Sequence, residues 1–190
     1  MTVDLTTFRE AMARFPSGVT IVTTIDSTRR RWGFTASAFT SLSMEPPQLL
    51  VCLNRSANCY PHFCESDRFA VNILSADHEA LARRFATKGI DKFTSVDVDF
   101  EQGAFQLPLL SDAVAAFECH KSTLVPSGDH VILIGEPLSI RIRSATPAVL
   151  FNHRFWGLHE AATSQANGAG SSRSANPATR AESTVAAKRQ

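Results

Sequence analysis

The sequence predicts a mainly β protein with peripheral helices, folded as an antiparallel barrel. Segments rich in β-branched and aromatic residues outnumber helical ones. The regular alternation of strand and helix that builds a parallel sheet is missing, and no glycine-rich phosphate loop occurs. Two long strand candidates are joined by the short segment Pro126-Ser127-Gly128-Asp129, which is typical of a hairpin. Together these features favour antiparallel strands.

A helix is expected first, with Thr7 and Glu10 as a capping box and Phe8, Met12 and Phe15 at helical spacing. Pro16 and Gly18 end it. Strands are expected over residues 19–25, 48–53, 69–74, 113–125, 130–143 and about 149–158. Short helices are expected over residues 60–65 and from a cap at Ser75 to Phe85, and residues 87–103 read as a loop.

The chain of 190 residues predicts one domain, residues 1–162, followed by a disordered tail, residues 163–190. The tail contains no Leu, Ile, Phe, Trp, Tyr or Met, so it cannot bury enough apolar surface to offset its chain entropy. It carries Arg173, Arg180, Lys188 and Arg189 against Glu182. A basic tail that docks a partner or a membrane is the alternative.

Composition excludes several classes of protein. A net charge of +1 argues against nucleic-acid binding driven by bulk charge. The longest apolar runs, such as residues 49–53, are far short of a membrane-spanning helix, and no signal peptide is evident, so a cytoplasmic location is expected.

No metal is expected, because the cluster of Cys59, His62 and Cys64 lacks a second ligand pair. Free thiols are predicted for Cys52, Cys59, Cys64 and Cys119.

Two segments have the chemistry of a ligand site. Residues 33–43, GFTASAFTSLS, are mostly small or hydroxylic, which lets a flat ligand approach the backbone closely. A small-residue strand packed against a helix is the alternative. Asn54-Arg55-Ser56 follows a buried strand and could cradle a phosphate, although a helix cap with a solvated arginine explains it equally.

Two further segments carry cations or a histidine. Arg83, Arg84, Lys88 and Lys92 gather at a helix end, where the helix dipole alone would favour them and where they could also bind a phosphate. His130 follows the hairpin loop and could donate a hydrogen bond or carry a proton, unless its role is structural. No nucleophile elbow and no acid–base carboxylate pair is evident.

Six stretches in order resemble one known family. They are FREAMARFPSGVTIVTT, WGFTASAFTSLSMEPPQLLVCLNRSAN, FAVNILSADHEALARRFA, KGIDKF, GDHVILIGE and PAVLFNHRF, within residues 5–158. They resemble the flavin reductase family, the small reductase components of two-component flavin monooxygenases. The resemblance implies an antiparallel FMN-binding split barrel, usually a homodimer with the flavin near the subunit interface. The Arg29-Arg30-Arg31 turn looks particular to this chain.

The resemblance also implies an activity, in which NADH or NADPH gives a hydride to FMN or FAD and reduced flavin passes to a separate oxygenase. The alternatives are a non-catalytic flavin carrier or sensor on the same barrel, and an oxidase acting directly on a small substrate, like the pyridoxamine-phosphate oxidase relatives of the fold. Backbone N–H groups around Ala36–Ala38 suit the charge that develops on the flavin edge.

Site residues follow from the resemblance by position. Those implied to bind the flavin are Thr35, Ala36, Ser37, Ala38, Ser41, Asn54, Arg55, Ser56, Arg84, Lys88, Lys92 and Phe93. Those implied to bind the nicotinamide are His130, Phe151, Asn152, His153 and Arg154. Of these, His130 is the candidate catalytic residue.

Overall fold

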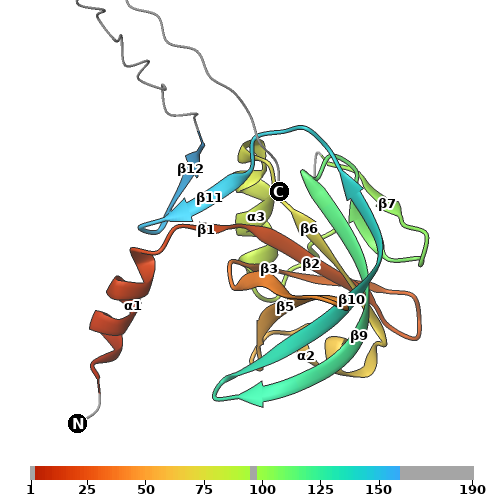
Figure 1. The fold of residues 1–190 in the computed structure, drawn as a ribbon, viewed down its shortest axis with the longest axis horizontal. Coiled ribbons are helices and arrows are strands. Elements are labelled where there is room, and N and C mark those ends of the chain that lie inside the picture. The colour runs from red at the N-terminus through yellow and green to blue at the C-terminus, as the bar shows by residue number, and fades with distance from the viewer. Residues whose placement is uncertain (1–2, 95–97, 159–190) are drawn as a thin grey trace, which may run out of the picture. The chain divides into compact units, whose positions relative to one another are not determined.

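Antiparallel strands build most of the computed structural model, which describes residues 3–94 and 98–158 (Figure 1). The predicted tail and the predicted domain end at residue 162 lie outside the described residues. The helical elements are α1 (Leu5–Ala13), α2 (Tyr60–Glu65), the 3₁₀ helix η1 (Ala76–His78) and α3 (Glu79–Ala86). None of the described helices is long and apolar enough to cross a membrane.

The strands form three sheets. They are β1 (Ser17–Gly18), β2 (Thr20–Ile25), β3 (Arg31–Ala36), β4 (Phe39–Met44), β5 (Pro47–Asn54), β6 (Arg68–Ile73), β7 (Phe100–Gln102), β8 (Pro108–Leu110), β9 (Ala115–Ser127), β10 (His130–Ile142), β11 (Ala148–Phe151) and β12 (Arg154–Gly157). The main sheet has seven strands in the order β3-β2-β6-β9-β10-β5-β4, and the small sheets are β1-β11-β12 and β7-β8. Every pairing is antiparallel, which confirms the predicted class.

Along strand β5, buried side chains alternate with side chains on the opposite face, which carries a predicted site residue. Leu49, Val51 and Leu53 are buried in the core, so Cys52 and Asn54 point to the opposite face of the strand. The register of the sheet pairs Asn54 with His130 at the start of β10. The end of β5 therefore brings two predicted site residues together.

Helix α3 packs on β3 through unusually close contacts. The Thr35 hydroxyl donates to the carbonyl of Ala82, with an Oγ1–O distance of 2.6 Å. A Cβ at Gly33 would lie 2.8 Å from a ring carbon of Phe85, closer than such atoms approach in proteins. Phe85 is fully buried, so only glycine fits at position 33 without moving that ring.

The described residues correct five expectations about elements. Helix α1 begins at Leu5 with Asp4 as its cap, because the Asp4 carboxylate, rather than Thr7, accepts the free backbone N–H. The hairpin turn contains only Gly128 and Asp129, since pairing continues through Ser127. Residues 149–158 are not one strand but the hairpin β11–β12.

The other differences are smaller. Asn152 and His153 both have positive φ angles, which reverse the chain between β11 and β12. Strand β7 lies within residues 87–103, which were expected to be a loop. The segment from Ser75 to Phe85 is two helices, because Ser75 caps η1 and α3 starts at Glu79.

Candidate functional site

A cavity in the described part of the chain has a volume of about 820 Å³, within the range typical of ligand sites. Its wall comes from β3, the connection to β4, the end of β5, the loop before α2, the end of α3, residues 88–93 and the start of β10. Nine of the predicted site residues line it: Thr35, Ala36, Ser37, Ala38, Asn54, Lys88, Lys92, Phe93 and His130. The structure therefore brings segments far apart in the sequence to one site.

The connection between β3 and β4 exposes backbone polar groups to this cavity. Ser37 and Ala38 are exposed and lie outside both strands. Among the described residues, neither of their backbone N–H groups donates a hydrogen bond, whereas the Ala38 carbonyl accepts one from the Cys52 N–H. These two N–H groups are therefore available to a ligand. The Thr35 hydroxyl donates to Ala82, so toward a ligand it can act only as an acceptor.

A polar cluster of Asn54, Ser56 and Lys88, here called the Lys88 cluster, joins two of the predicted segments. The Lys88 ammonium donates to the Ser56 hydroxyl, with an Nζ–Oγ distance of 3.0 Å. Asn54 Oδ1 accepts from both the N–H and the hydroxyl of Ser56. An exposed ammonium beside a fixed hydroxyl is a suitable contact for a phosphate group. The neighbouring Arg55 is exposed and does not line the cavity.

Two other predicted cations hold the loop after α3 in place. The Arg84 guanidinium donates to the carbonyls of Asp91, Lys92 and Thr94, and it does not line the cavity. Lys92 donates to the carbonyls of Gly33 and Phe85, and burial lowers the pKa of its ammonium. Both side chains thus fix the cavity wall, and most of their N–H donors already bind backbone carbonyls.

His130 lies half-buried at the cavity edge. Its Nδ1 is 2.7 Å from a carboxylate oxygen of Asp129, and this contact lowers the pKa of Asp129. The carboxylate orients the ring and leaves Nε2 without a described partner. Such an imidazole can donate a hydrogen bond or carry a proton at the cavity edge.

The remaining predicted residues lie elsewhere. Ser41 is on the exposed face of β4 and does not line the cavity. Phe151, Asn152, His153 and Arg154 form the β11–β12 turn, outside the cavity, where the Asn152 N–H donates to the carbonyl of Ala13. The structure does not bring the predicted nicotinamide residues next to His130 within one protomer.

Sequence reasoning missed several lining residues, among them Arg30, Arg31, Trp32, Asn58, Cys59 and Phe85. The first three directly precede the small-residue segment, and that adjacency was a usable signal. Cys59 carries no nucleophilic chemistry, because burial raises the pKa of its thiol to about 11. No group of three metal-ligating side chains is present within the described residues.

Comparisons with known proteins identify the family. The family described as a flavin reductase like domain matches residues 12–159. An actinorhodin polyketide dimerase of Streptomyces coelicolor is 45% identical over 163 residues, covering 85% of this chain and 91% of that protein. The FMN reductase (NADH) RutF of Variovorax paradoxus is 41% identical over 152 residues, covering 77% of this chain and 81% of that protein.

Solved structures are similar as well. The NADH:FAD oxidoreductase SgcE6 of Streptomyces globisporus, in complex with NAD and FAD fragments, is 32% identical with a TM-score of 0.76, covering 86% of this chain and 99% of that one. BorF, the flavin reductase component of a bacterial two-component tryptophan halogenase, is 29% identical with a TM-score of 0.76, covering 83% of this chain and 100% of that one. The predicted barrel class is confirmed.

Some relatives are longer. A probable flavin reductase of Rhizobium meliloti is 41% identical over 132 residues, and the chain spans 42% of its length.

Proposed function

The chain belongs to the flavin reductase family, and on that premise we propose that it is an NAD(P)H-dependent flavin reductase that supplies reduced FMN or FAD to a separate monooxygenase. The observation that carries the proposal is the cavity, whose small-residue wall offers two free backbone N–H groups and which borders the Lys88 cluster. Hydride transfer from nicotinamide to flavin is chemistry that the two cofactors supply themselves when bound. The protein has to bind, orient and shield them.

The residues present fit a flavin. Ser37 and Ala38 carry only small side chains, so a flat ring can lie against their backbone. Their unpaired N–H groups are suited to hydrogen-bonding the edge of a heterocycle and to stabilising charge that develops there. Phe34, Leu53 and Phe93 provide apolar surface in the same cavity.

The phosphate of the flavin is assigned to the Lys88 cluster. Lys88 is exposed and has one fixed hydrogen bond, to Ser56, so its remaining N–H donors can meet a phosphate oxygen. Arg55 follows Asn54 on the same exposed loop, and Ser41 lies on the neighbouring strand β4, so both remain proposed contacts to the chain of the flavin. Arg84 and Lys92 support the loop that carries Lys88.

His130 is proposed to act on the nicotinamide side. It is the first residue of β10 and lines the cavity, with its ring oriented by Asp129. The predicted nicotinamide residues Phe151, Asn152, His153 and Arg154 lie outside the cavity of their own protomer. They can contribute to it only from a second protomer.

A homodimer is therefore part of the proposal. Apolar side chains are exposed on α1, directly after α1 and on the β11–β12 hairpin: Phe8 is 54%, Phe15 68% and Trp156 53% exposed. Such a patch on one protomer is favourable to bury against another copy. A cytoplasmic location belongs to the same proposal, since reduced nicotinamides are the electron donors of that compartment and all four cysteines are free.

The oxygenase partner is proposed from the relatives. BorF serves a two-component system, and the Streptomyces coelicolor relative is named for polyketide dimerisation. An oxygenase that acts on a polyketide is therefore the first partner to test. The assay would mix this reductase, NADH and flavin with candidate oxygenases and measure oxygenated product.

The reductase activity itself has a simple test. The purified protein is mixed with NADH or NADPH and with FMN or FAD, and the absorbance of the reduced nicotinamide is followed. Consumption that requires both protein and flavin supports the proposal. A protein that binds flavin but consumes neither nicotinamide with either flavin is the non-catalytic carrier or sensor instead.

A further inference from the structure

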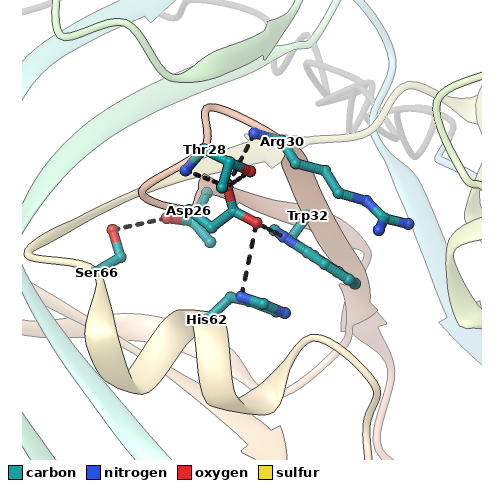
Figure 2. Close-up of polar contacts among 7 residues, drawn as sticks. Asp26, Thr28, Arg30, Trp32, His62 and Ser66 are labelled. Carbon is teal, nitrogen blue, oxygen red and sulfur yellow. Dashed lines mark hydrogen bonds and ion pairs between the residues drawn. The ribbon is translucent and has the colours of Figure 1, made fainter.

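Three side chains, here called the Trp32 stack, form a layered arrangement at the cavity wall (Figure 2). The Trp32 indole and the His62 imidazole are parallel within 13°, with ring centroids 3.8 Å apart. The Arg30 guanidinium carbon lies 4.5 Å from the Trp32 centroid. Because the imidazole covers one face of the indole, the guanidinium lies over the other. Arg30 and Trp32 line the cavity and His62 does not, so Arg30 is the outer, ligand-facing layer.

Asp26 holds this stack in position. Its Oδ2 accepts from the indole N–H of Trp32 at 2.9 Å, and its Oδ1 accepts from the N–H and hydroxyl of Thr28 and from the N–H of Arg30 (Figure 2). The bond from Trp32 is the largest of the causes that hold the pKa of Asp26 well below its ordinary value of 3.8. The stack is therefore preorganised by an ionised carboxylate, and a ligand need not order it on binding.

The same wall is rich in cationic groups. Arg31 is exposed, lines the cavity and has its guanidinium 4.8 Å from the Phe93 centroid. Asp91 is the carboxylate on this wall, so the two guanidinium groups leave it net positive. Arg29 differs from both neighbours, because it donates to Gln106 and does not line the cavity.

A planar cation backed by an aromatic ring is a stacking platform for a purine, and adjacent guanidinium groups bind phosphate. The Lys88 cluster, already assigned to one phosphate, borders the same cavity. A ligand with two phosphates can thus contact both groups. Resting on the proposed function, we propose that the Trp32 stack and Arg31 bind the adenylate group of a dinucleotide.

Two dinucleotides of the proposed reaction carry this group. If it belongs to FAD, the stack makes the protein prefer FAD over FMN. If it belongs to the nicotinamide dinucleotide, the stack contributes to the affinity for the electron donor with either flavin. In both cases the specificity resides in Arg30, at the end of the β2–β3 turn, and in Arg31 and Trp32, at the start of β3.

The test compares Arg30→Gln with Arg29→Gln. Both variants remove one charge from the same turn, but only Arg30 belongs to the stack. Binding of AMP, FAD and FMN is measured by calorimetry, and the KM for NADH is measured with FMN as acceptor. We expect Arg30→Gln to weaken AMP binding about ten-fold, the order of one stacking contact, and Arg29→Gln to change it less than about two-fold.

The other measurements distinguish the two sources. A matching loss for FAD but not FMN assigns the adenylate to FAD, and a raised KM for NADH with unchanged FMN binding assigns it to the nicotinamide dinucleotide. An Arg30→Gln variant that binds AMP as well as Arg29→Gln does, or that loses FMN and FAD equally with no change for NADH, overturns the proposal. AMP and FAD binding need no turnover, so a protein that fails to oxidise NADH refutes the proposed function and leaves this test intact.

Discussion

Two regions of the molecule differ in how far their side chains are buried and hydrogen-bonded within one protomer. The cavity region, built by β3, β5, α3 and the start of β10, has buried neighbours, fixed hydrogen bonds and a formed binding site. The hairpin region, built by α1, the residues 14–16 that follow it, β11 and β12, has no buried residue in α1 and exposes Phe15 and Trp156. Both regions carry residues that the family resemblance assigns to the site.

The difference shows which region is ordered before a ligand binds. In the cavity region Lys92, Arg84 and Asp26 form hydrogen bonds that hold the wall in place, so the binding surface is preorganised. In the hairpin region large apolar side chains have no cover among the described residues of the chain. We therefore expect variants in the first region to affect folding and flavin binding, and variants in the second to affect assembly.

The largest effect is expected from Gly33→Ala. The new Cβ would lie 2.8 Å from Phe85, so the variant should lose about 1–3 kcal/mol of unfolding free energy, as overpacked cores do. Gly157→Ala in β12 is the matched control, because nothing lies within 4 Å of its Cβ position. Denaturant unfolding of both variants measures the contrast. Equal losses would mean that the two regions are equally tightly packed.

Phe15→Ser should act on assembly instead. Removing one large apolar side chain from a buried dimer contact costs about 1.5–3 kcal/mol, or roughly 10- to 100-fold in the dissociation constant. Ile142→Ser, at the 84% exposed end of β10, is the control. Sedimentation over a concentration series measures both. A Phe15→Ser protein that dimerises like the control would remove the hairpin region from the interface.

Lys88→Ala should weaken flavin binding about ten-fold, the value of one charge-assisted hydrogen bond to phosphate. Its global stability should change little, since Lys88 is exposed. Arg83→Ala is the control, because Arg83 pairs with Glu79 on the same helix away from the cavity. Riboflavin, which lacks the phosphate, should bind both variants alike in a fluorescence titration; a selective loss of riboflavin would relocate Lys88 to the ring.

The smallest expected effect is the change in stability of Asp26→Asn as the pH falls. Asp26 is ionised in the folded protein because hydrogen bonds depress its pKa, so its contribution is full above its ordinary value of 3.8 and is lost as the pH falls through the folded value. Asp26→Asn should therefore be less stable than the parent at pH 7, with a gap that narrows below about pH 4.

Asp4→Asn is the counterpart in the hairpin region. The pKa of Asp4 is also lowered, by the Thr7 N–H at the start of α1, but asparagine caps a helix nearly as well. Melting temperatures of both variants across the pH range give the comparison. A gap for Asp26→Asn that is constant with pH would show that its charge is not what stabilises the turn.

The sequence predicted the class of the fold because strand patterning and hairpin chemistry are local. It placed β2, β5, β6, β9 and β10 closely, where branched or alternating apolar residues mark buried strands. It merged β11 with β12, because Asn152 and His153 take positive φ angles that neither residue type requires. Short strands such as β7 gave too little pattern to detect.

For the site, the sequence predicted the backbone segment 35–38 and the residues of the Lys88 cluster. It did not predict which of the cations face the cavity and which bind backbone carbonyls. Arg84 and Lys92 look like phosphate ligands in the sequence, yet each is occupied by backbone carbonyls from other segments. The Trp32 stack was missed because His62 comes from α2, and only the tertiary fold brings it to Trp32.

A crystal structure with FMN or FAD bound tests the central claim most directly. We expect the flavin ring against residues 37–38, with their backbone N–H groups within hydrogen-bond distance of its polar edge, and the first phosphate at Lys88 and Ser56. A flavin bound only at the β11–β12 hairpin, or with its phosphate remote from Lys88, would contradict the proposed site.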